Sequence, residues 1–198
     1  APGESTRLIS SITQDWSGAD LPGLPTSVNS LTTLLNPTKN TSGTIDLDQV
    51  TQAAKSITGT LTPLQGLFQS GTADKTARTE IASNKNLPGG AAAAKVLDTA
   101  GGADLGGAIT SAKQLTGLAS DTRGSRQIPI QSAQARELAT VATTLSKQAA
   151  PLVNTDQKTL SDSTSVLSNL GPQKVVSQSL GAYSTLSGVD FGTIVTAI

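Results

Sequence analysis

The 198-residue sequence contains no cysteine, no histidine and no methionine. Without cysteine the chain can form neither disulfide bonds nor thiolate metal sites, and it has no thiol nucleophile. Without histidine it lacks the commonest general base and the commonest metal ligand of proteins. Carboxylates, lysine, tyrosine and serine suffice for some reactions, but no catalytic arrangement of them stands out. We therefore expect a protein that is not an enzyme and that uses no cofactor and no metal.

Charged and aromatic residues are also scarce. Charged residues make up 14% of the sequence, against roughly a quarter in ordinary soluble domains. Aromatic residues make up 2%, and the 14 basic residues balance the 14 acidic ones. No basic face suited to a nucleic-acid backbone is apparent, so we expect no nucleic-acid partner. The core must be aliphatic, and the surface must consist mainly of hydroxyl and amide groups.

No apolar run approaches the roughly 18 to 20 residues that a membrane-spanning helix needs. We therefore expect no transmembrane segment. The chain starts at Ala1-Pro2-Gly3 rather than at methionine, which favours removal of a secretory signal. A clipped initiator methionine is the alternative explanation. On composition and on this start, we expect a secreted, extracellular protein, with the cell wall as one location.

The most regular pattern lies within residues 46–68. Its apolar residues recur alternately three and four positions apart, which places them on one stripe of a helix. The members are Leu47, Val50, Ala54, Ile57, Leu61, Leu64 and Phe68. Either Asp46 or Asp48 suits the start of this helix as a cap. Pro63 predicts a kink in the helix or its division.

Helical spacing outnumbers period-2 alternation in nearly every other segment. The predicted helices are 5–16, 25–36, 46–68, a weak one in 73–86, a short one around Val96 and Leu97, 105–118, 130–152 with a break near Pro151, 160–170, and 175–198 with a break at Ser187-Gly188. The many threonines argue for strands instead, but the repeated spacing favours helices. We predict an all-α fold, a helical bundle of about six to eight amphipathic helices. We expect one domain over residues 1–198, with any division near 88–104.

Several shorter features help to place the loops. Polar and glycine-rich sequence predicts loops over 38–44 and 121–127. Asn154 or Thr155 is expected to cap the helix over 160–170. The sequence Asn40-Thr41-Ser42 is a sequon for N-glycosylation, so Asn40 is a candidate for modification. In 121–127, two arginines either hold an anion or belong to a solvated loop.

Aliphatic cores without bulky aromatic residues lose their uniqueness before they lose stability. We therefore expect the helices to separate at modest cost and to accept an acyl chain or an apolar surface. Tyr183 either anchors a carboxylate head group or belongs to the core. The predicted apolar lining of the ligand site is Leu61, Leu64, Phe68, Leu138, Val141, Leu145, Leu180 and Tyr183.

The segment AAPLVNTDQKTLSDSTSVLSNLGPQKVVSQSLGAYSTL, residues 149–186, carries a resemblance to a known family. With the trimmed start and helices rich in Ser, Thr, Ala and Leu throughout, it resembles secreted fungal proteins that bind hydrophobic surfaces and the related cell-wall mannoproteins. The resemblance implies a helical bundle with an apolar cavity or groove that takes fatty acids or coats hydrophobic material. The Gly-Gly pairs within 88–107 depart from the compact pattern of that family.

Two functions therefore stand as expectations. The first is binding of a fatty acid, another apolar ligand or an apolar surface. The alternative is a structural, adhesive or immunogenic protein of the cell wall without a small-molecule ligand. Such a protein would bind partners through loops such as 38–44 or 121–127. Neither the identity of a ligand nor the oligomeric state follows from the sequence.

Overall fold

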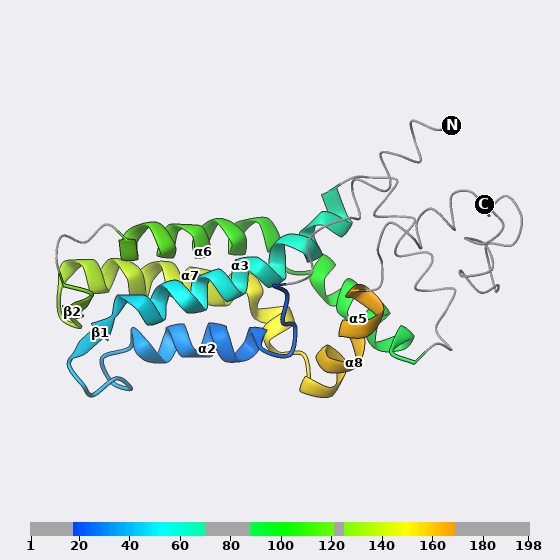
Figure 1. The fold of residues 1–198 in the computed structure, drawn as a ribbon, viewed down its shortest axis with the longest axis horizontal. Helices are drawn as coiled ribbons and strands as arrows, with labels where there is room; N and C mark the ends of the chain where they lie inside the picture. Colours follow the sequence, from blue (N-terminus) through cyan, green and yellow to red (C-terminus); the bar gives the residue numbers. More distant parts are fainter. Residues whose placement is uncertain (1–17, 70–87, 121–124, 169–198) are drawn as a thin grey trace, which may run out of the picture. The chain divides into compact units, whose positions relative to one another are not determined.

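The computed structural model describes residues 18–69, 88–120 and 125–168 (Figure 1). Within these residues 73% are helical, and six helices and one two-stranded sheet are present. The elements are α2 Leu24–Leu34, β1 Thr44–Asp46, α3 Leu47–Gln69, α5 Gly90–Gly101, α6 Leu105–Ser120, β2 Gln127–Pro129, α7 Ala133–Val153 and α8 Gln157–Ser168. The predicted all-α helical bundle is confirmed. The helices predicted in 5–16, 73–86 and 175–198 lie outside the described residues.

Internal contacts divide the chain into two compact units. The four-helix unit consists of Gly18–Thr62 and Gly102–Thr155. The α5–α8 unit contains Pro63–Gly101 and the chain from Asp156 onward, of which 63–69, 88–101 and 156–168 are described. That the two units form one folding domain stays a prediction.

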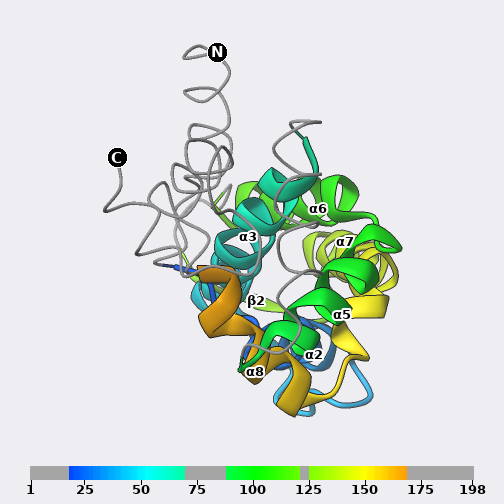
Figure 2. The ribbon, with the colours of Figure 1, turned by 90° about the vertical axis from the view of Figure 1, so that its right-hand side faces the viewer.

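In the four-helix unit, α2, the first part of α3, α6 and α7 lie side by side and run alternately in opposite directions (Figures 1 and 2). At one end β1 and β2 pair antiparallel, with Ile45 opposite Ile128. Both isoleucines are buried and the residues beside them are more exposed. This short sheet was not predicted. It ties the connection before α3 to the connection before α7.

The core of the four-helix unit is aliphatic, as the composition requires. From Leu47 to Leu61, every member of the predicted stripe is 0% exposed. Large apolar side chains of α7 complete this core, among them Leu138 and Leu145. No aromatic side chain is among the buried residues of the described ranges. Burial of aliphatic surface, worth about 25 cal/mol per Å², is therefore the main force that stabilises this unit.

Small residues bring α6 and α7 close together. Ala108 and Ala112 of α6 and Ala149 of α7 are fully buried, and the two helices are the most closely paired in the unit. The Ser111 hydroxyl donates a hydrogen bond of 2.8 Å to Oε1 of Gln148 across this seam. Close packing of small side chains thus fixes this pair of helices.

The α5–α8 unit has its own aliphatic core. Its buried residues include Val96 and Leu97 of α5 and Leu160 and Leu167 of α8. Gly89 lies in the turn before α5 with a φ of +83°. This left-handed conformation favours glycine.

The predicted limits of three helices need correction. Helix α7 starts only after Ser132, whose hydroxyl accepts a hydrogen bond from the Ala135 amide. Pro151 lies within the last turns of α7 and does not break it, and Asn154 caps its C-terminus rather than starting α8. Likewise, α3 is continuous through Pro63. A proline in a helix removes one hydrogen bond, and the surrounding buried contacts outweigh that loss here.

The N-cap of α8 is Asp156 rather than the predicted Asn154 or Thr155. Its carboxylate accepts hydrogen bonds from the Thr159 hydroxyl at 2.6 Å and from the Thr159 amide at 3.1 Å. The side-chain bond from Thr159, followed by the backbone bond, lowers the pKa of Asp156 below its ordinary value. Because the pKa is lower in the folded chain, this cap contributes stability above the unfolded pKa and loses it as the pH falls through the folded pKa.

At neutral pH we therefore expect Asp156→Asn to have a lower midpoint temperature of unfolding than wild type. In acid we expect this difference in midpoint temperature to be smaller. Asparagine still offers an oxygen acceptor but cannot ionise. The measurement is thermal unfolding by circular dichroism for both proteins, from about pH 7 down to about pH 2, a range that brackets the ordinary aspartate pKa. A difference that stays constant over this range would contradict the assignment of the cap.

Candidate functional site

Part of the predicted apolar lining comes together in the four-helix unit. Leu61 of α3 and Leu138, Val141 and Leu145 of α7 all belong to its core. Leu61, Leu138 and Leu145 are 0% exposed, and Val141 is 8% exposed. These residues pack against protein rather than facing open space. A ligand could reach them only if neighbouring helices moved apart.

The other predicted lining residues lie elsewhere. Leu64 and Phe68 belong to the α5–α8 unit, where Leu64 is buried and Phe68 is partly exposed. A Cβ atom built on Gly101 would lie 3.7 Å from Cε1 of Phe68, so this ring packs beside α5. Leu180 and Tyr183 lie outside the described residues. The full set therefore stays a prediction as a ligand site.

Helix α3 is spaced more widely from its neighbours than the other helices of the four-helix unit. More Cα pairs within 8 Å join α7 to α6 and to α2 than join α3 to any described helix. Interhelical distance depends on the side chains at the contact. The α3 seam is filled by large residues such as Val50, Ile57 and Leu61. Contacts between these side chains, rather than close backbone approach, hold α3 in place.

Few polar contacts of the described residues tie the middle of α3 to its neighbours. The Ser27 hydroxyl on α2 donates a 3.3 Å hydrogen bond to the Ser56 hydroxyl. The Asp20 amide donates a 2.9 Å hydrogen bond to the buried hydroxyl of Thr60. Net contributions of such bonds are about 0.5 to 1.5 kcal/mol each. Apolar burial therefore dominates the attachment of this helix.

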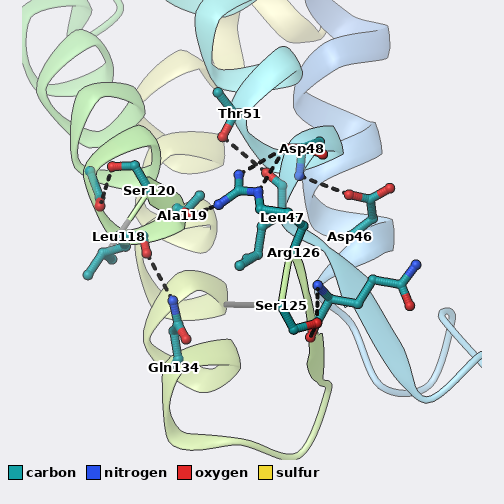
Figure 3. Close-up of polar contacts among 12 residues, drawn as sticks. Asp46, Leu47, Asp48, Thr51, Leu118, Ala119, Ser120, Ser125, Arg126 and Gln134 are labelled. Atoms are coloured by element: carbon teal, nitrogen blue, oxygen red, sulfur yellow. Dashed lines mark hydrogen bonds and ion pairs between the residues drawn. The ribbon is translucent and has the colours of Figure 1, made fainter. Parts of the chain in front are cut away.

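Arg126 fixes the start of α3 and the end of α6 (Figure 3). Its Nε donates to Asp48 Oδ1 and its Nη1 donates to the Ala119 carbonyl, both at 2.9 Å. Its own carbonyl accepts a 2.8 Å hydrogen bond from the Leu47 amide. The guanidinium is thus engaged within the protein, which argues against the hypothesis of an anion site. Arg123, the other arginine of that hypothesis, lies outside the described residues.

A groove of about 1020 Å³ lies over α2, α3 and the connection between them. Most of its lining residues carry hydroxyl or amide side chains, but apolar atoms make up the larger part of its exposed surface. The lining residues are Thr26, Ser27, Asn29, Ser30, Leu31, Thr33, Leu34, Lys39, Asn40, Thr41, Ser42, Gln49, Gln52, Ala53 and Ser56. None of the predicted apolar lining residues contributes to it. The sequence did not indicate this α2–α3 groove.

Asn40 holds the connection at the edge of the groove in shape. Its Nδ2 donates to the Leu34 carbonyl at 2.8 Å and to the Thr44 carbonyl at 2.9 Å. Its Oδ1 accepts from both the amide and the hydroxyl of Ser42. Glycosylation of Asn40 stays a prediction, but a sugar on Nδ2 would replace one of the two hydrogens that these carbonyls accept.

We expect Asn40→Ala to lower the free energy of unfolding by about 1 to 3 kcal/mol, because the carbonyls of Leu34 and Thr44 lose their donor. The matched control is Thr41→Ala, whose side chain is exposed and makes no hydrogen bond within the described residues. Urea unfolding of unglycosylated protein measures both changes. Equal stability of the two variants would show that the Asn40 amide does not hold the connection.

The described part of the chain contains no helix long and apolar enough to cross a membrane. In the same ranges no three His, Cys, Asp or Glu residues are grouped so that they could hold a metal ion. Comparisons of the chain with protein-family models, curated proteins and solved structures found no match. The function is therefore argued from the geometry alone.

Proposed function

We propose that the protein is a secreted, non-enzymatic binder of apolar ligands, with fatty acids as the leading class, or of apolar surfaces. The observation that carries the proposal is the attachment of α3. Its stripe of aliphatic side chains is fully buried, and few polar contacts hold the middle of the helix to its neighbours. We infer that α3 is the helix that separates to expose the stripe.

The physical reason is that the ligand and the core have the same aliphatic chemistry. When an acyl chain enters between α3 and α7, its methylene groups replace contacts of Leu61, Leu138 and Leu145 with other aliphatic contacts. Apolar surface then stays out of water. Side chains of this kind adapt to a new neighbour more readily than aromatic or hydrogen-bonded ones. The net cost of opening is therefore small compared with opening a core of mixed chemistry.

The alternative is a structural or adhesive protein of the cell wall without a small-molecule ligand. One observation favours it. The connection between α2 and β1 is exposed, and its shape is fixed by the hydrogen bonds of Asn40 and Ser42. A rigid exposed loop suits recognition by a protein partner. This function requires no movement of α3.

An engineered disulfide tests the movement of α3. The hydroxyl oxygens of Ser27 and Ser56 are 3.3 Å apart, so a Ser27→Cys, Ser56→Cys variant can link α2 to α3 with a small adjustment. The chain has no other cysteine, so the bond forms without competition. We expect oxidation to stabilise the protein by about 3 to 4 kcal/mol and to block uptake of oleate. Reduction of the same protein restores uptake.

Native mass spectrometry with added oleate measures uptake, and adsorption to an apolar surface is measured in parallel. Each single-cysteine variant serves as a control for the substitutions. If the oxidised and reduced forms take up oleate equally, uptake does not require α3 to move away from α2. If wild type neither retains oleate or palmitate nor adsorbs to the surface, the proposed function is wrong and the structural role gains support.

A further inference from the structure

The α2–α3 groove is lined by polar side chains that make no hydrogen bond within the described residues. All of them are exposed. They are Thr26, Asn29, Ser30, Thr33, Lys39, Thr41, Gln49 and Gln52. Within the described part of the chain, their donors and acceptors are left to solvent. They are therefore available to a ligand that can replace that solvent.

Several hydroxyls elsewhere on the helices are engaged with their own backbone. On α7, the hydroxyls of Thr140, Thr143 and Thr144 each donate to the carbonyl four residues earlier, at 2.9 to 3.1 Å. On α2, Thr32 lies outside the groove and donates to the Asn29 carbonyl, whereas its neighbour Thr33 lines the groove and makes no such bond. The groove therefore includes hydroxyl groups that are free to bind a ligand, such as that of Thr33.

The charge of the lining restricts the class of ligand. Among the described residues that line the groove, Lys39 is the one charged residue and none is a carboxylate. Nucleic acids and strongly acidic polymers need a basic surface, which this groove lacks. Side-chain amides such as Gln49 and Gln52 each offer donors and an acceptor in one plane, an arrangement suited to neighbouring hydroxyl groups. The lining therefore fits a neutral ligand that is rich in hydroxyls.

The shape of the groove points in the same direction. Its partly exposed apolar residues, Leu34 and Ala53, offer contact to the C–H faces of a sugar ring. Its volume of about 1020 Å³ lies just above the range of about 300 to 1,000 Å³ for small-molecule sites. That size favours several linked rings over a single monosaccharide.

We propose that the α2–α3 groove binds a neutral oligosaccharide, either free or as the head group of a glycolipid. This site goes beyond the proposed binding of apolar ligands. It does not depend on that function, because its polar side chains face solvent and need no movement of α3. The ligand is held by hydrogen bonds to hydroxyl and amide side chains and by apolar contact.

The test is a titration of ¹⁵N-labelled protein followed by amide chemical shifts. The probes are maltotriose, mannotriose and cellotriose for a free oligosaccharide, dodecyl maltoside below its micelle concentration for a glycolipid head group, and a sialylated trisaccharide for an acidic ligand. We expect shifts confined to α2, the first half of α3 and residues 35–43 with at least one neutral probe. Binding of dodecyl maltoside without maltotriose would identify the glycolipid as the source, and binding of both would identify the free sugar.

Paired variants make the result specific to the groove. Asn29→Ala with Gln52→Ala removes two exposed amides and should weaken binding at least tenfold without loss of folding. The matched control is Thr110→Ala with Gln114→Ala on α6, which are also exposed and make no hydrogen bond within the described ranges. It should bind within twofold of wild type.

Three results would overturn the proposal. They are no shift with any neutral probe at millimolar concentration, binding of the sialylated probe alone, and equal affinity of the groove variant and its control. None of these depends on uptake of oleate, which is measured separately. Failure of the oligosaccharide site is therefore distinguishable from failure of the proposed apolar function.

Discussion

Replacing Leu145 with alanine is expected to lower the free energy of unfolding by about 2 to 5 kcal/mol. Leu145 is 0% exposed in the middle of α7. The substitution removes apolar surface from the core and leaves a cavity. No buried aromatic ring of the described residues is present to fill the space. The cost approaches the lower end of that range if the aliphatic neighbours collapse inward, as the proposed function requires of them.

Urea unfolding of Leu145→Ala measures this cost. The matched control is Leu118→Ala on α6, where the same chemical change is made at a partly exposed position. Because less apolar surface is lost from the core, we expect Leu118→Ala to cost about 1 kcal/mol. Comparable losses for the two variants would show that the described packing of α7 is incorrect.

Replacing Gly89 with alanine is expected to cost about 2 to 4 kcal/mol. Its φ of +83° costs an L-residue about 1 to 2 kcal/mol. A Cβ atom would in addition lie far inside contact distance of the Asp162 carbonyl oxygen and 3.1 Å from Cγ2 of Val166. Since the carbonyl belongs to the backbone of α8, it cannot turn aside, and α5 must shift away from α8.

Gly43→Ala is the control that separates the two causes. Gly43 has a φ of +81°, but nothing lies within 4 Å of a Cβ atom built there. It therefore suffers the conformational cost alone, about 1 to 2 kcal/mol. Hydrogen exchange should show loss of protection in α5 and α8 for Gly89→Ala. If Gly89→Ala is as mild as Gly43→Ala, the close approach of α5 and α8 is absent in solution.

The aliphatic spacing predicted most of the described helices because burial imposes a period on the sequence. The stripe of α3 from Leu47 to Leu64 is buried as predicted. The prediction fails at the C-terminal end of α3, where Leu67 is 0% exposed and Phe68, the predicted member of the stripe, is partly exposed. The last turns of α3 belong to the α5–α8 unit. A different set of neighbours there buries a different face, which no period along a single helix could indicate.

Features that depend on distant segments escaped prediction. Each strand of the small sheet has a single buried isoleucine, Ile45 or Ile128, between more exposed residues. An alternation over three residues is too short to recognise. The α2–α3 groove was missed for a related reason. Its polar residues look like ordinary exposed positions on their own helices, and only the pairing of the two helices brings them together.

Pro63 has a further consequence for α3. Because proline carries no amide hydrogen, the Gly59 carbonyl four residues earlier receives no helical hydrogen bond from it. That gap in the ladder falls where α3 passes from the four-helix unit to the α5–α8 unit. When α3 unfolds from its C-terminal end, unfolding is expected to pause at this missing hydrogen bond. The first four turns of α3 can therefore stay folded after the remainder has melted.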